Sequence, residues 1–146
     1  MKKILNVVLL VFGMSILFTS CEGLEGTGVN SWIVGDWIMI EDNGEAYSPY
    51  EYLRFTRDGY FAVVFGYRGN KKNCWFDNGT LYSTPEVEWD TEIEAEYKID
   101  NGNLITAGIV IGKVEKINKD KFYFDAYNDY EGTYVRIKNF KTQERQ

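Results

Sequence analysis

The chain has 146 residues, enough for one domain with a single core, and its 45% hydrophobic and 16% aromatic content excludes a disordered chain. A net charge of −6 lacks the basic footprint that a phosphate backbone requires, so we expect no nucleic-acid partner. Histidine is absent, and the sequence has no phosphate-binding loop or nucleophile elbow. We therefore predict no enzyme activity, with no catalytic residues, no metal site and no cofactor.

Residues 1–20 have the three parts of an export signal, because a lysine-containing start precedes the apolar run 4–18 and a cysteine follows at position 21. The run is shorter than the roughly 20 residues that span a bilayer as a helix. Phe18, three residues before the cysteine, is too bulky for ordinary signal peptidase but suits a lipobox. The segment resembles a bacterial lipoprotein signal peptide, which implies cleavage after Ser20 and lipid on Cys21.

Lipid on Cys21 would make a membrane the first partner of the chain, since its acidic charge disfavours adhesion to an anionic surface. We expect an exported protein that is lipid-anchored in the bacterial cell envelope, at the outer membrane, with its periplasmic or surface face left open. Secretion without lipid and an uncleaved anchor are the alternatives. Residues 21–30 comprise this cysteine and a glycine-rich, acidic stretch, which predicts a flexible tether.

Residues 31–137 carry the patterns of short β-strands. Residues 92–100 alternate apolar and charged side chains, as a half-buried strand does. The turn at residues 56–59 separates two alternating segments, 52–56 and 60–65, which is a hairpin signature. Further strands are expected at residues 34–41, 79–83, 104–105, 114–117, 122–127 and 132–137.

About eight antiparallel strands that each hide one face close most economically into an up-and-down β-barrel, because closure leaves no exposed edge. We therefore predict an all-β barrel domain over residues 31–137. A two-sheet β-sandwich is the competing architecture. Residues 138–146 are mostly polar, and we expect them to form a fraying tail.

A Gly-x-Trp motif lies at the start of the first predicted strand, at Gly35 and Trp37. Together with segments 52–61, 96–104 and 132–136, in this order, it resembles the lipocalin-like domains of bacterial lipoproteins. The domain is shorter than a typical lipocalin and offers neither a C-terminal helix nor a cysteine pair, which argues against a roomy ligand cup.

The resemblance implies structural roles for three residues at the closed end of the barrel. Trp37 would pack there, and Arg136 in the last strand would lie across its ring in a cation–π contact. Gly35 would permit a close approach of the chain.

The inward positions of the predicted strands are candidates for a ligand-binding interior. Such residues either line a pocket for a small apolar ligand or fill the core, and an eight-stranded barrel lies at the boundary between the two. Their bulky rings favour a filled or narrow interior. The candidates are Leu53, Phe55, Phe61, Val63, Phe65, Ile93, Tyr97, Phe122 and Phe124.

Two other patterns bear on function. Acidic residues alternate along 86–96, which indicates the wet face of a strand rather than a metal site. Trp32, Trp75 and Trp89 either form a stacking platform or cap the barrel. The sequence thus predicts an envelope lipoprotein whose lipocalin-like barrel binds a small apolar or amphipathic ligand. The alternative is a non-enzymatic module that recognises a glycan or protein partner through its loops and exposed aromatics.

Overall fold

A computed structural model describes residues 31–146 and contains eleven β-strands over this range. The predictions for the signal peptide (1–20), for lipid on Cys21 and for the tether (21–30) lie outside the described residues. Within 31–146, no helix has the length and apolarity to cross a membrane. The strands are β1 (Gly35–Ile40), β2 (Glu51–Phe55), β3 (Tyr60–Tyr67), β4 (Cys74–Asp77), β5 (Thr80–Ser83), β6 (Glu88–Asp100), β7 (Asn103–Thr106), β8 (Ile109–Asn118), β9 (Lys121–Ala126), β10 (Gly132–Ile137) and β11 (Asn139–Thr142).

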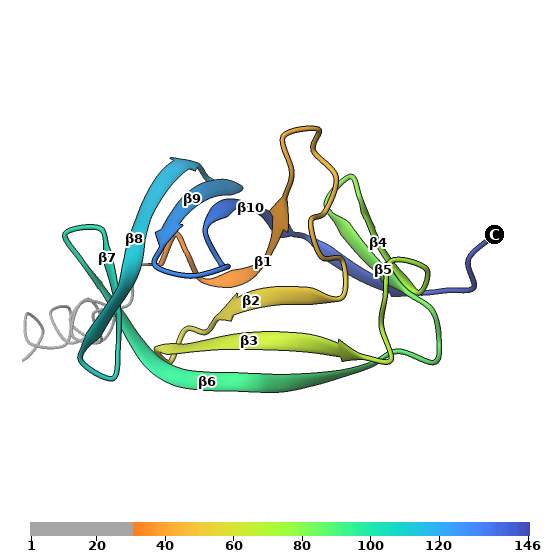
Figure 1. The fold of residues 1–146 in the computed structure, drawn as a ribbon, viewed down its shortest axis with the longest axis horizontal. Coiled ribbons are helices and arrows are strands. Elements are labelled where there is room, and N and C mark those ends of the chain that lie inside the picture. Colours follow the sequence, from red (N-terminus) through yellow and green to blue (C-terminus); the bar gives the residue numbers. More distant parts are fainter. Residues whose placement is uncertain (1–30) are drawn as a thin grey trace, which may run out of the picture.

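Eight of the strands form a closed barrel in the order β1-β10-β9-β8-β7-β6-β3-β2, and every neighbouring pair is antiparallel (Figure 1). The predicted all-β barrel is confirmed, and the sandwich alternative is not adopted. Closure pairs the first barrel strand with the last, so that β1 and β10 leave no free edge between them.

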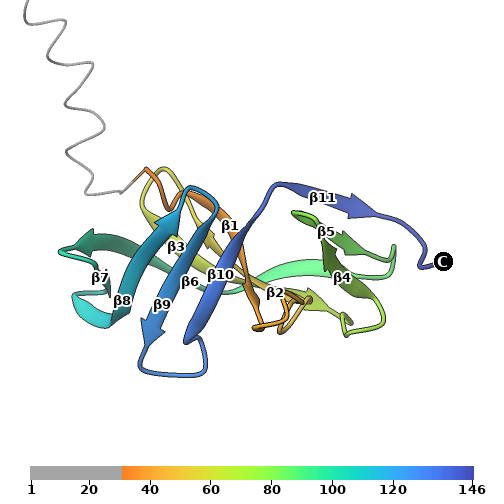
Figure 2. The same ribbon diagram turned by 90° about the horizontal axis from the view of Figure 1, so that it is seen from above.

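The barrel has two opposite ends, which Figure 2 shows by the β8–β9 turn along the upper side and the β9–β10 loop along the lower side. We call the floor the end formed by residues 31–34 and the turns at 56–59 and 119–120. We call the mouth the opposite end, formed by the loops at 41–50 and 127–131.

Aromatic rings fill the barrel interior from the floor upward. The rings of Trp37 and Phe122 meet edge to face with centroids 4.8 Å apart, and Phe122 stacks on Tyr134 at 5.2 Å. Phe55 contacts Tyr97 with centroids 5.1 Å apart. Since each of these rings is at most 5% exposed, this part of the barrel is a solid core.

A second, three-stranded sheet in the order β11-β5-β4 covers the outer face of the barrel. Outward side chains of β1, β2 and β3, namely Ile38, Tyr52 and Val64, are buried in a cluster with Leu81 of β5 and Ile137. The barrel wall is thus apolar on both faces here. This cover corrects the prediction that residues 79–83 form a barrel strand.

The C-terminal residues also differ from the predicted polar tail. Residues 139–142 form β11, which pairs in parallel with β5. The ring of Phe140 lies 5.4 Å from that of Tyr52, so the one large apolar residue of this segment anchors it to the barrel. Backbone pairing and this contact order a segment whose composition alone predicts fraying.

Strand β6 is irregular where it approaches the mouth. Ile93 pairs with Val63 but Thr91 pairs with Val64, so Glu92 is an extra residue in a β-bulge. The next strand, β7, pairs with β6 only as far as Tyr97. The residues of β6 that precede Tyr97 have no hydrogen-bonded partner strand on the β7 side, so the barrel wall is open along this edge of β6.

Candidate functional site

Arg136 at the floor lies over the ring of Trp37, with its Cζ 4.1 Å from the ring centroid, as the resemblance predicts. The guanidinium donates hydrogen bonds to the carbonyl oxygens of Val34 (2.7 Å) and Trp32 (2.8 Å). The indole N–H of Trp37 donates to the carbonyl of Ile33 at 2.6 Å. The floor thereby satisfies its own polar groups and closes this end of the barrel.

Gly35 is required by the same arrangement. Its φ of +137° is one that side-chain-bearing residues rarely adopt, and a Cβ there would collide with the guanidinium of Arg136. Gly35, Trp37 and Arg136 therefore form a packed structural unit.

Most of the predicted lining residues fill the core. Phe65 is only partly buried, and it packs against the cluster from the mouth side with its ring 6.5 Å from that of Tyr50. Ile93 is 45% exposed and does not belong to the interior, because the uncovered wall of β6 leaves its inner face open. The predicted residues within the core cluster are Leu53, Phe55, Phe61, Val63, Tyr97, Phe122 and Phe124.

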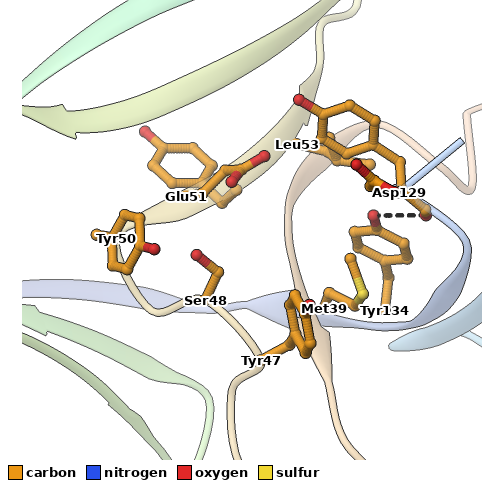
Figure 3. Close-up of a pocket in the computed structure, with 10 residues that line it drawn as sticks. Met39, Tyr47, Ser48, Tyr50, Glu51, Leu53, Asp129 and Tyr134 are labelled. Carbon is orange, nitrogen blue, oxygen red and sulfur yellow. Dashed lines mark hydrogen bonds between the residues drawn. The ribbon is translucent and has the colours of Figure 1, made fainter. Parts of the chain in front are cut away.

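A pocket of about 280 Å³ opens above this core, at the mouth (Figure 3). Figure 3 shows Glu51 and Tyr50 on one side of the recess and Met39, Asp129 and Tyr134 on the other. Of the nine predicted interior residues, Leu53 alone borders it. The lining consists of Met39, Tyr47, Ser48, Tyr50, Glu51, Tyr52, Leu53, Asp129, Tyr130 and Tyr134.

Sequence reasoning missed the polar part of this lining. Glu51 lies two residues before Leu53 and four before Phe55, so strand alternation already places it on the inner face. Tyr47, Tyr50 and Tyr130 come from the loops at 41–50 and 127–131, where no periodicity indicates direction, whereas Tyr134 lies on β10. For the charged part of the lining, an acidic residue at an inward strand position was therefore the available signal.

Glu51 is the central charged group of the mouth pocket. Partial burial raises the pKa of its carboxyl, the nearby hydroxyl of Tyr130 partly offsets this, and the charge of Glu92 raises that pKa further. The pKa of Tyr130 is raised to about 12, through its own burial and the charge of Glu51. The charge of Glu92, the extra residue of the β-bulge, therefore acts on the mouth pocket.

Tyr134 supports the loop that carries these groups. Its hydroxyl donates a hydrogen bond to the carbonyl of Tyr130 at 2.9 Å, and its ring is buried on Phe122. Burial raises the pKa of the Tyr134 phenol, which keeps it a neutral donor. The base of the mouth pocket is thus buried and hydrogen-bonded, whereas Tyr47 at the rim of this pocket is 56% exposed.

The other candidate groups do not form sites of this kind. Trp32 packs against Phe122, Trp89 against Tyr52, and Trp75 stacks on Tyr82, so the three tryptophans do not share a platform. Cys74 is fully buried, and burial raises its pKa to about 11, which keeps it a thiol. Among residues 31–146, no three acidic or cysteine side chains gather as a metal site would require.

No protein-family model matches the chain, and no curated protein or solved structure is detectably similar to it. The assignment of a β-barrel fold therefore comes from the structure alone. The resemblance to lipocalin-like lipoprotein domains stays a prediction from short motifs and their order.

Proposed function

We propose that this chain is a non-enzymatic lipoprotein of the bacterial cell envelope, anchored at the outer membrane by lipid on Cys21, and that its lipocalin-like barrel binds a small amphipathic ligand at the mouth. The N-terminal sequence supports the anchor, since an apolar run ends in a lipobox-like cysteine. The closed barrel is compatible with a lipocalin-like carrier.

The observation that carries the binding proposal is the pocket above the solid core. Its volume of about 280 Å³ lies just under the roughly 300–1,000 Å³ of pockets for drug-sized molecules, so the ligand must be small. Met39, Leu53 and tyrosine rings supply apolar contact, while Glu51 and Asp129 supply polar groups. This mixture suits an amphipathic ligand better than a hydrocarbon.

Native mass spectrometry tests this proposal. The full chain would be expressed with its export segment in a bacterial envelope, extracted in mild detergent and weighed under native and denaturing conditions. A stoichiometric added mass that disappears on denaturation is expected, beyond the covalent mass of the lipid. A protein that carries no such mass, from either membrane or soluble extracts, would contradict a ligand-carrying barrel.

The lipid anchor has its own test. Replacing Cys21→Ser removes the sulfur that would accept lipid, so we expect the covalent lipid mass to be lost and the export segment to be retained. The matched control is Cys74→Ser, which changes the other cysteine and should leave both the lipid mass and the cleavage unchanged. A Cys21→Ser protein that still carries the lipid mass would refute the anchor.

Exposed rings around the mouth favour a second candidate function. Tyr127 is 80% exposed and Tyr67 is 65% exposed, at the ends of β9 and β3. Such rings suit recognition of a glycan or an envelope protein by the loops. Loss of partner capture in Tyr127→Ala and Tyr67→Ala, with no ligand mass in the wild type, would favour this function over the first.

A further inference from the structure

The mouth pocket combines aromatic rings with negative charge. Tyr47, Tyr50, Tyr130 and Tyr134 line it together with the carboxylates of Glu51 and Asp129. None of the ten lining residues is a lysine or an arginine. Ring faces and carboxylates both attract positive charge, so the pocket is complementary to a cation.

Elsewhere in the described part of the chain, aromatic rings make cation–π contacts with lysine and arginine side chains of the same chain. Five cation–π contacts occur within residues 31–146, and none of them involves Tyr47, Tyr50, Tyr130 or Tyr134. The contacts pair Arg54 with Tyr52, Lys116 with Trp32, Arg136 with Trp37, Lys141 with Tyr82 and Arg145 with Trp75. The mouth rings that surround Glu51 are left without a cation of this kind.

Glu51 likewise has no ion-pair partner within residues 31–146, where the salt bridges join Arg54 to Asp36 and both Arg136 and Lys138 to Asp120. The charged groups that act on this site are negative. Glu92 raises the pKa of Glu51, and Asp129 raises the pKa of Tyr130, the neighbour of Glu51, so both carboxylates repel a further negative charge. A half-buried carboxylate held against like charges costs folding free energy that a bound cation would recover.

We propose that the mouth pocket binds a small organic cation, with its ammonium group beside Glu51 and its methyl or methylene groups against the surrounding tyrosine rings. A metal ion fits less well, because the lining offers only the two carboxylates of Glu51 and Asp129, whereas hard cations take six or more oxygen ligands. This inference rests on the proposed function and specifies the chemical class of its ligand. The pocket volume limits the ligand to a compact ammonium compound.

Isothermal titration calorimetry on the detergent-extracted lipoprotein, at low ionic strength, tests this inference. The probes are choline and 3,3-dimethylbutan-1-ol, which has the same shape without the charge. Because each tenfold change in affinity corresponds to about 1.4 kcal/mol, one desolvated cation–π contact is enough for the expected preference. We expect choline to bind at least about tenfold more tightly than the alcohol.

Two matched variants locate the charge. Glu51→Gln should weaken choline binding at least about tenfold. Glu94→Gln removes the same charge from an exposed position on β6, and it should leave the affinity within about twofold, because exposed charges are screened.

Each other outcome overturns the inference in a distinct way. Equal binding of the two probes would refute a cation site but leave the mouth pocket as an amphipathic site. Choline binding that Glu51→Gln does not change would refute the position of the charge. Absence of binding by both probes would refute the cation inference, while native mass spectrometry decides separately whether the barrel carries another ligand.

Discussion

The floor and the mouth of this barrel are both rich in aromatic rings, but the charged groups beside these rings differ in sign. At the floor, Trp37 receives the guanidinium of Arg136, which also binds the carbonyls of Val34 and Trp32. At the mouth, tyrosine rings surround Glu51, and the nearest charges described above are negative.

The difference supports the proposal that the floor is structural and that the mouth binds a ligand. The ring cluster at the floor has its cation and its hydrogen bonds supplied by the chain itself, and truncating it must cost stability. The rings around the half-buried carboxylate at the mouth have no such cation, and the proposed ligand would supply one. On the proposed function, stability and binding are therefore separated along the barrel axis.

The largest effect is expected at Trp37. Trp37→Ala removes a fully buried ring from the floor, and we expect it to lower the free energy of unfolding by about 3–5 kcal/mol in urea titrations. Tyr127→Ala at the mouth, 80% exposed, is the control and should stay within about 0.5 kcal/mol of wild type. A loss under about 1 kcal/mol at Trp37 would refute its place in the floor.

Arg136→Met sharpens the role of the floor cation. This change keeps an apolar stem but loses the cation–π contact and the hydrogen bonds to backbone carbonyls, so we expect a loss of about 2–3 kcal/mol in the same titrations. Arg136→Lys keeps the charge and should recover part of it. Equal stabilities of Arg136→Met and wild type would show that the floor does not depend on its cation.

Substitutions at Val63 and Ile93 compare a closed part of the barrel wall with the part that is open along β6. The two residues face each other across β3 and β6, yet Val63 is 1% exposed and Ile93 is 45% exposed. Val63→Ala should cost about 2 kcal/mol, whereas Ile93→Ala should cost about 0.5 kcal/mol or less. Similar costs in chemical denaturation would mean that the wall is closed at Ile93.

The smallest effect, and the one with opposite sign, is expected at Glu51. The pKa of Glu51 is higher in the folded chain than its ordinary value of 4.5, so the unfolded chain loses this proton first as the pH rises. Ionisation of Glu51 therefore lowers the stability of the fold as the pH rises past 4.5, and the full loss is reached above the folded pKa. Glu51→Gln should raise the midpoint of thermal unfolding by about 1–3 °C at pH 7. This gain should vanish below pH 4.5, and a decrease at pH 7 would instead make Glu51 a structural residue.

The barrel was predictable from sequence because local patterns dictate it. Alternation at residues 92–100 and the turn at 56–59 mark β6 and the β2–β3 hairpin, which the structure contains. The second sheet was not predictable in the same way. Leu81 and Phe140 lie in short segments, and only the apolar outer face of β1–β3 explains the burial of Leu81 and the contact of Phe140 with Tyr52.

The candidate site was only partly predictable for a similar reason. The floor motif is visible because Gly35 and Trp37 are close in sequence and Arg136 lies in the closing strand. The mouth brings together Glu51 and two loops whose direction no periodicity gives. The bulge at Glu92 is also invisible, because alternation along 86–96 continues in the sequence while the register shifts in the structure.

The most direct test of the division between floor and mouth is a choline titration of the ¹⁵N-labelled lipoprotein in micelles, followed by amide chemical shifts. Saturable shifts are expected at residues 47–51 and 129–134, while residues 35–37 and 119–121 at the floor stay unchanged. Shifts that are confined to the floor, or absent at the mouth, would contradict the assignment of binding to the mouth.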